Sequence, residues 1–161
     1  MPSCDPAVRL VEITTDNRAA IEALTVTAVQ DDYVAGVADS LAEAAELPDA
    51  RPWYRAVYLG DEPVGFVMIS DGIPDGHPEL LGPYFLWRLL IDTRWQGRGF
   101  GRAALDLVVA HVRTRPDARV LLTSIQPGSV GSPRGFYLTY GFTSTGQIFD
   151  GEEVLELELA R

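Results

Sequence analysis

The feature that most constrains this chain is the stretch QGRGFGRAAL, residues 96–105, in which three glycines alternate just before a helical pattern. Glycine inside a helix costs about 1 kcal/mol relative to alanine, so three together need a structural reason. The run that precedes them, residues 84–91, is apolar and rich in aromatics, and it is too short for a typical helix. We therefore expect a central strand, a tight glycine loop and a helix in direct succession.

This succession predicts a site for an anion. The first N–H groups of a helix have no partner inside the helix, and the helix dipole adds a partial positive charge at that end. Gly97, Gly99 and Gly101 would let a phosphate group approach the backbone closely, and Arg98 and Arg102 would add charge at the rim.

Two common phosphate-binding loops do not match. A P-loop needs a lysine, and all 13 basic residues of this chain are arginine. A dinucleotide fingerprint has the rhythm G-x-G-x-x-G and an acidic residue about 20 positions later. Here the rhythm is G-x-G-x-G, and Asp117, near the required distance, falls in a Pro-Asp loop.

Length and composition limit the remaining choices. The 161 residues are enough for one domain with a real core, and 47% of them are hydrophobic. A formal charge of −10 argues against nucleic acid as a partner; it permits a cationic substrate, or simply keeps the protein soluble. The sequence contains no apolar run of membrane-spanning length and no secretory pattern at its start, and it has one cysteine, Cys4. We expect a cytoplasmic protein that does not bind membranes.

The periodicity of apolar residues predicts one mixed α/β domain over residues 1–161. Ser40 and Glu43 form a capping-box pattern that predicts a helix start at Ser40, and Pro48 predicts its end. The expected strands are 8–13, 53–59, 64–69, 84–91, 119–124, 143–149 and 152–159, and the expected helices are 16–29, 40–47, 98–113 and 132–140.

Two segments carry a resemblance to a known family. LLIDTRWQGRGFG resembles the acyl-CoA-binding motif of the GNAT N-acetyltransferase superfamily, with matches at Gln96, Gly99 and Gly101. GFYLTYGF, residues 135–142, resembles the family's Leu-Tyr-x-x-x-Gly-Phe segment. Within the superfamily the chain is most similar to bacterial diamine and spermine/spermidine acetyltransferase-like proteins, on the stretches QDDYVAGVADSLAEA, EPVGFVMI, WRLLID and TGQIFDGEEVLELEL.

The resemblance implies a GNAT fold: a single α/β domain with a mixed, mostly antiparallel sheet of six to seven strands, about four helices and a splayed parallel strand pair at the cofactor slot. It implies acetyl-CoA as the cofactor, with the pantetheine along residues 84–91 and the diphosphate on the N–H groups of residues 96–102. An asparagine frequent in the family is absent from this chain, where backbone groups or Ser132 would take over its contact. The predicted cofactor residues are Leu89, Leu90, Ile91, Gln96, Gly97, Arg98, Gly99, Phe100, Gly101, Arg102, Ser132 and Tyr137.

For catalysis, the resemblance assigns Tyr137 to the leaving thiolate, either as its acid or as a hydrogen-bond donor to the sulfur. The glutamate base of the family's histone-modifying branch is replaced by Phe85. Four other carboxylates are candidates for the base, each with a competing structural reading: Glu79, Asp92, Glu152 and Glu153. Asp92 could instead cap the turn after its strand.

Substrate contacts are expected from the first two helices, the strand that follows and the terminal hairpin. The candidates are Gln30, Tyr33, Trp53 and Glu153, while Ser40 and Glu43 are better explained by the capping box. His77 and His111 have no neighbours of metal-ligand type, so no metal site is predicted.

The function that this pattern implies is transfer of an acetyl group from acetyl-CoA to the primary amine of a small molecule, with a polyamine as one candidate, by direct attack of the amine. Two alternatives remain open: an acetyltransferase for a peptide N-terminus or lysine, and a non-catalytic acyl-CoA-binding module. Relatives of this pattern are often homodimers, so a homodimer is also expected.

Overall fold

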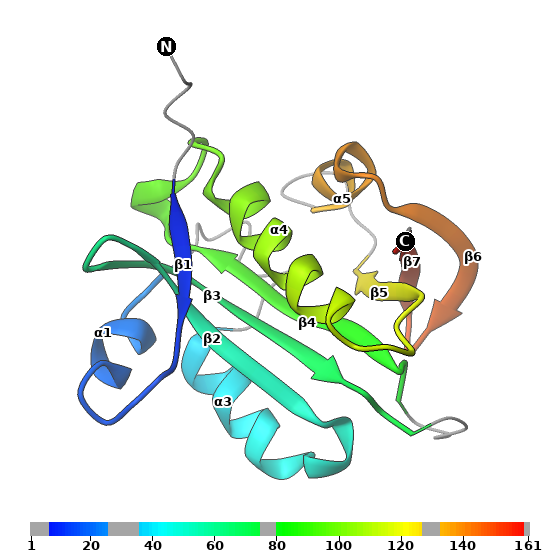
Figure 1. Ribbon diagram of the computed structural model, residues 1–161, viewed down its shortest axis with the longest axis horizontal. Coiled ribbons are helices and arrows are strands. Elements are labelled where there is room, and N and C mark those ends of the chain that lie inside the picture. Colours follow the sequence, from blue (N-terminus) through cyan, green and yellow to red (C-terminus); the bar gives the residue numbers. More distant parts are fainter. Residues whose placement is uncertain (1–6, 26–35, 75–79, 127–132, 160–161) are drawn as a thin grey trace.

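The structure, a computed structural model, describes residues 7–25, 36–74, 80–126 and 133–159 (Figure 1). The elements follow the predicted order, and residues 84–91 form a strand with the predicted bounds. The strands are β1 (Val8–Val11), β2 (Pro52–Leu59), β3 (Glu62–Asp71), β4 (Tyr84–Ile91), β5 (Val120–Ile125), β6 (Thr143–Phe149) and β7 (Glu152–Glu158); the helices are α1 (Arg18–Glu22), α3 (Val37–Glu46), α4 (Phe100–Arg113) and α5 (Arg134–Tyr140).

The seven strands of the described chain form one mixed sheet in the order β1-β2-β3-β4-β5-β7-β6. Each neighbouring pair is antiparallel except β4 and β5, which run parallel. That pair is joined at Phe85–Leu122 and Leu86–Thr123, although the two strands have eight and six residues. The strands therefore separate after Leu86, as the predicted splayed pair requires.

A β-bulge lies on β4 next to this separation. Met68 of β3 pairs with Arg88 and Ile69 pairs with Leu86, so Trp87 is the extra residue on β4. Side chains on a strand alternate between the two faces of a sheet, and one inserted residue changes that phase. Leu86 accordingly packs on the α4 side, whereas Leu90 packs with α1 and α3.

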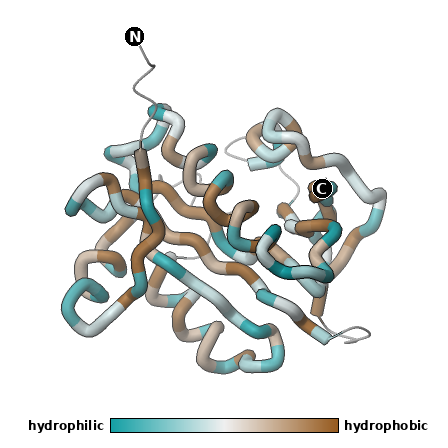
Figure 2. Tube along the Cα trace, viewed as in Figure 1, coloured by the Kyte–Doolittle hydropathy of each residue, from teal (hydrophilic) through white to brown (hydrophobic). Residues whose placement is uncertain are grey.

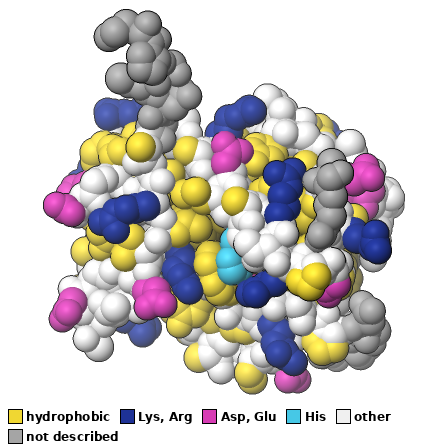
Figure 3. Space-filling view, viewed as in Figure 1, with side chains coloured by type: hydrophobic (Ala, Val, Ile, Leu, Met, Phe, Trp, Pro, Cys, Tyr) yellow, Lys and Arg dark blue, Asp and Glu magenta, His cyan; other side chains and the backbone are white. Residues whose placement is uncertain are grey.

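Helices cover both faces of the sheet. α4 contributes Leu105, Val108 and Val112 to the larger core, and α1 and α3 contribute Ile21 and Leu41 to the smaller core on the opposite face. Figure 2 shows the hydrophobic residues concentrated along the central strands, with hydrophilic residues in the turns. On the face that α4 covers, basic and acidic side chains are interspersed (Figure 3). Within the described ranges, no helix combines the length and the apolar character that crossing a membrane requires.

Two predicted helix boundaries are wrong. The predicted helix 16–29 is the short α1, which ends at Glu22, and the backbone N–H of Thr25 donates to Asp92 instead of continuing the helix. The capping box is also wrong, because α3 begins at Val37 and Ser40 lies inside it, donating to the carbonyl of Gly36 at 2.8 Å. Glu43 therefore has no capping role.

Candidate active site

A cavity of about 340 Å³ lies where β4 and β5 separate. Thr123 on β5 contacts Tyr137 of α5, and the next residue, Ser124, contacts Glu152 of β7. Because adjacent strand residues point to opposite faces, the cavity passes through the sheet from the α4–α5 face to the α3 face. Its lining residues are Glu43, Leu47, Ala50, Ser70, Leu80, Leu81, Phe85, Trp87, Arg88, Leu89, Thr123, Ser124, Ile125, Gln126, Pro133, Tyr137, Phe149, Asp150 and Glu152.

The glycine loop between β4 and α4 has the backbone conformation of an anion seat. Gly97 and Gly99 have φ of +77° and +84°, a region that side chains rarely adopt. Gly99 is the N-cap of the 14-residue α4, and as a glycine it has no side chain to cap the first N–H groups. A Cβ at Gly101 would lie 3.6 Å from the ring of Phe136, an ordinary van der Waals contact, so the packing of α5 on α4 does not itself require glycine there.

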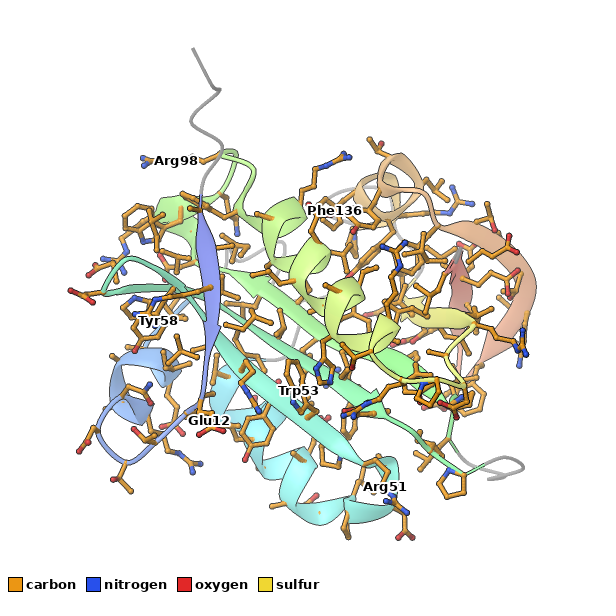
Figure 4. All side chains as sticks on the ribbon, in the orientation of Figure 1. Glu12, Arg51, Trp53, Tyr58, Arg98 and Phe136 are labelled. Atoms are coloured by element: carbon orange, nitrogen blue, oxygen red, sulfur yellow. The ribbon has the colours of Figure 1, made fainter. Side chains whose placement is uncertain are left out.

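Two arginines stand beside this loop, as the sequence predicts. Arg98 is exposed, and its guanidinium lies 5.3 Å from the Trp95 ring centroid. Figure 4 shows its side chain pointing outward from the loop, while Phe136 lies between α4 and α5. Arg102 is 5.6 Å from the ring centroid of Tyr140. Both cations can reach solvent near the first turn of α4 and add to its partial positive charge.

The end of β4 is held by Gln96 and Asp92. The Gln96 side chain donates to the carbonyl of Ile91 at 2.8 Å, which helps to hold the loop against the strand end. Asp92 caps the turn Thr93–Trp95 by accepting from the Arg94 N–H, and it also accepts from the Thr25 N–H at 2.9 Å. Burial alone would raise the pKa of Asp92, but these hydrogen bonds outweigh it and lower that pKa. Asp92 is therefore a structural cap.

Tyr137 lies at the centre of the site. It is 7% exposed and lines the cavity, and Thr123 of β5 lies beside it. The Thr123 hydroxyl itself donates to the carbonyl of Leu86, the last β4 residue paired with β5. Burial raises the pKa of Tyr137 to about 12, so its proton is retained throughout the physiological pH range. Tyr137 thus presents a protonated hydroxyl at the point where the strands separate.

The four carboxylates that the sequence offers as candidate bases differ in what the structure shows of their surroundings. Glu79 lies outside the described residues, and Asp92 is the structural cap described above. Glu153 is held by Arg134 at 2.9 Å and by the Ser144 hydroxyl at 2.8 Å, and it is not among the cavity residues. Glu152 lines the cavity and accepts a 2.6 Å hydrogen bond from Ser124.

An ion pair crosses the α3 side of the cavity. Arg88 donates to Glu43 at 2.8 Å and to the carbonyl of Trp87, and Glu43 and Arg88 both line the cavity. Phe85, at the position of the glutamate in the histone-modifying branch, also faces the cavity but offers no carboxylate. Of the described residues that line the cavity, three are acidic and one is basic: Glu43, Asp150 and Glu152 against Arg88.

Trp53, a further predicted substrate contact, does not line the cavity. Gln30, Tyr33 and Ser132 lie outside the described residues. Trp53 is on β2, where its ring stacks on His111 of α4 with centroids 4.0 Å apart (Figure 4). His111 in turn lies 3.0 Å from Asp71.

Sequence reasoning missed Arg88, Thr123 and Ser124 as cavity residues. Arg88 had one available signal, because it is the only charged residue in the run 84–91. The face of the sheet toward which the Arg88 side chain points depends on the bulge at Trp87, and no local sequence pattern predicts that bulge. Thr123 and Ser124 had no signal at all, since an ordinary strand contains such residues.

The comparisons with known proteins agree with this geometry. The model of the Acetyltransferase (GNAT) family matches residues 18–142. A curated relative, the spermine/spermidine N(1)-acetyltransferase of Bacillus subtilis (strain 168), is 29% identical over 154 residues, which cover 95% of this chain and 99% of the relative. The chain therefore belongs to the GNAT family, and it is an acetyltransferase.

Solved structures share the fold. The aminoglycoside acetyltransferase AAC(6')-Ib in complex with coenzyme A superimposes with a TM-score of 0.72 at 16% identity, covering 94% of this chain and 95% of that one. An acetyltransferase from Bacillus subtilis in complex with CoA has a TM-score of 0.63 at 15% identity, covering 95% of this chain and 98% of that one. An acetyltransferase from Thermus thermophilus has a TM-score of 0.64 at 20% identity, covering 94% of this chain and 97% of that one. The predicted GNAT fold is confirmed.

Proposed function

We propose that this protein transfers the acetyl group of acetyl-CoA to the primary amine of a small molecule, by direct attack of the amine on the thioester. The observation that carries the proposal is the cavity through the sheet between β4 and β5. It has a tyrosine hydroxyl on the α5 side and carboxylates on the α3 side. A donor and an acceptor can thus enter from opposite faces and meet where the strands separate.

The residues present fit the cofactor. The N–H groups of residues 99–102, at the start of α4, and the charges of Arg98 and Arg102 would hold the diphosphate. The β4 backbone beyond Leu86 has no β5 partner in the described register, so residues 89–91 can bond to the pantetheine amides. Acetyl-CoA supplies an activated acyl group with a thiolate as its leaving group.

Tyr137 would serve the leaving sulfur as a hydrogen-bond donor. An alkyl thiol has a pKa of about 8.5, so complete proton transfer from a tyrosine with a pKa of about 12 is uphill by about 5 kcal/mol. A hydrogen bond that strengthens as negative charge develops on sulfur avoids that cost. Of the two roles that the resemblance allows for Tyr137, the hydrogen-bond donor is therefore favoured over the acid.

A polyamine is the acceptor that we favour. The similar Bacillus subtilis protein is named for spermine and spermidine. Among the described lining residues the acidic side chains outnumber the basic ones by three to one, which suits an acceptor with more than one amino group. Leu47, Trp87 and Phe149 offer apolar surface to the methylene chain between amino groups.

A thiol-release assay tests the function directly. Acetyl-CoA is mixed with the protein and a panel of spermidine, spermine, aminoglycosides, amino acids and peptides, and free thiol is measured. We expect amine-dependent release that is fastest with a polyamine, and mass spectrometry should show the acetylated amine. Release with peptides alone would favour the protein-acetylating alternative. Tight acetyl-CoA binding with no release across the panel would contradict the proposed function.

A further inference from the structure

We propose that Glu152 is the catalytic base, and that Ser124 positions its carboxylate. This inference rests on the proposed function, since it concerns the proton that the attacking amine must lose. Glu152 is the first residue of β7 and Ser124 is on β5, and the two strands are hydrogen-bonded neighbours. The pairing of Ser124 with Val154 sets the register, so the Glu152 carboxylate is brought to the Ser124 hydroxyl at 2.6 Å.

The sheet places this carboxylate on the face from which the acceptor enters. Leu155 belongs to the core under α4, and alternation along β7 therefore directs Glu152 to the opposite face. The same rule directs Ser124 away from Thr123, the partner of Tyr137. The hydroxyl that faces the leaving sulfur and the carboxylate that faces the amine thus come from opposite faces of the same opening.

The other charged groups of the cavity are less suited to the role. Glu43 is occupied by Arg88 through a 2.8 Å ion pair. Asp150 is exposed at the turn between β6 and β7, where it has a φ of +51°. Glu152 is half-buried, and its described partner is a neutral hydroxyl that fixes its orientation without neutralising its charge. Of the described lining carboxylates, Glu152 is the one that is oriented by a hydrogen bond and is not paired with a cation, so it can accept a proton.

A neutral primary amine attacks the carbonyl carbon of the thioester, and a nitrogen–carbon bond forms. The carbon–sulfur bond breaks, and its electron pair leaves with the sulfur, which accepts a hydrogen bond from the Tyr137 hydroxyl. The nitrogen loses one N–H proton to the Glu152 carboxylate, which later releases it to solvent. A carboxylate suffices because the nitrogen that loses the proton is becoming an amide nitrogen, which is a very weak base.

Glu152→Gln tests the assignment, because glutamine keeps the size of the side chain and an oxygen that can accept from Ser124. We expect kcat to fall about 10²-fold, the usual contribution of a general base, while the KM for the amine and the Kd for acetyl-CoA change less than about threefold. Ser124→Ala keeps the carboxylate and should lower kcat by about fivefold, well below the loss of the base itself. Glu156→Gln is the matched control, since Glu156 lies on the same face of β7 and is not a cavity residue; its kcat should equal that of the wild type.

Chemical rescue separates a base from a structural residue. Added formate should restore part of the activity of Glu152→Ala, about tenfold over the variant alone, and should leave the wild type unchanged. Unchanged kcat in Glu152→Gln, or a raised KM with unchanged kcat, would overturn the base while the proposed function stands. A wild-type protein that releases no thiol with any amine would overturn both.

Discussion

Two carboxylates of this molecule, Asp71 and Glu152, illustrate how the same group serves structure in one region and chemistry in another. The Asp71 side chain, at the end of β3, is 9% exposed and accepts hydrogen bonds from Arg115 at 2.6 and 3.1 Å and from His111 at 3.0 Å. Glu152 lines the cavity and accepts from the neutral Ser124. Asp71 is held by two basic side chains, and Glu152 faces space that a substrate can enter.

The donors that bond to each carboxylate distinguish the two roles. A carboxylate whose oxygens already accept hydrogen bonds from an arginine and a second donor is poorly suited to accept a reacting proton, and its bonds hold elements together. Asp71 ties β3 to α4 in this way, and Asp92 ties β4 to the segment after α1. The Glu152 carboxylate is oriented by the Ser124 hydroxyl and can still accept a proton from a substrate.

Replacing Asp71 by Asn should lower stability and spare catalysis. The Asp71 side chain is buried, but Arg115 is 43% exposed, so solvent screens the pair and losing the carboxylate should cost about 2 kcal/mol through its charge-assisted hydrogen bonds. We expect the free energy of unfolding, measured by urea denaturation, to fall by about that amount. The kcat of the folded variant should stay within about twofold of the wild type, since Asp71 is not a cavity residue. A large loss of kcat with unchanged stability would reverse the roles that we assign.

The same carboxylate predicts how stability depends on pH. Burial alone would raise the pKa of Asp71, but the hydrogen bonds from Arg115 and His111 outweigh it and hold that pKa below its ordinary value. The folded state therefore binds this proton less readily than the unfolded state. The stabilisation is present above the ordinary aspartate pKa of about 4 and is lost as the pH falls through the lower, folded value. Urea denaturation from about pH 6 to about pH 3 should show a smaller decline for Asp71→Asn than for the wild type.

Replacing Tyr137 by Phe should reduce kcat about 10²-fold, because the hydroxyl that meets the developing charge on sulfur is removed. The apolar ring remains to fill its place in the core, so the Kd for acetyl-CoA, measured by calorimetry, should change less than about threefold. Tyr140→Phe is the matched control, since the Tyr140 hydroxyl donates to Asp106 and is not at the cavity. Equal kcat in Tyr137→Phe and the wild type would remove Tyr137 from the mechanism.

The pH dependence of the wild-type rate provides a further test of Tyr137. Because the pKa of Tyr137 is about 12, this residue stays protonated up to about pH 11. The attacking amine, with a pKa near about 10, becomes neutral as the pH rises. We therefore expect kcat/KM for a polyamine to rise between about pH 6 and about pH 9 without a descending limb. A decline above about pH 8 that is absent in Tyr137→Phe would contradict the raised pKa.

Two glycines offer a matched pair for the loop. Gly97 and Gly146 both have a φ of +77°, and at neither would an added Cβ meet another atom within 4 Å. Alanine at either position should cost about 1 kcal/mol of stability, because side chains disfavour this conformation. Gly97→Ala alone should also weaken acetyl-CoA binding, about fivefold by calorimetry, because the loop backbone would no longer sit as closely against the diphosphate. Equal binding by both variants would place the diphosphate elsewhere.

The sequence predicted the fold well where local patterns decide it. The central strand, its glycine loop and the hairpin turn at Asp150-Gly151 all depend on local preferences for apolar runs and positive φ, and all three are confirmed. The capping box was misjudged because Ser40 and Glu43 have the right spacing by chance. Their side chains bond instead to the carbonyl of Gly36, one turn earlier, and to Arg88 on a distant strand.

The site was only partly predictable, because it combines local motifs with contacts between residues that are far apart in the sequence. Tyr137 and the loop glycines lie in recognisable motifs. The choice of Glu152 over Glu153 depends on strand register, which sends the first to the cavity and the second to Arg134. Leu155 and Leu157 alternate with Glu156 and Glu158, and this pattern places Glu153 on the leucine face of β7 and Glu152 on the other. Which of these glutamates reaches the cavity depends on tertiary packing that the sequence does not show. The homodimer expected from the resemblance stays a prediction.

A crystal structure grown with coenzyme A tests the central claim most directly, since the account requires the donor and the acceptor to meet in the opening between β4 and β5. We predict density for the diphosphate against the N–H groups of residues 99–102, with the sulfur within hydrogen-bond distance of the Tyr137 hydroxyl. Coenzyme A bound away from this opening, or a sulfur on the far side of the sheet from Tyr137, would contradict the account.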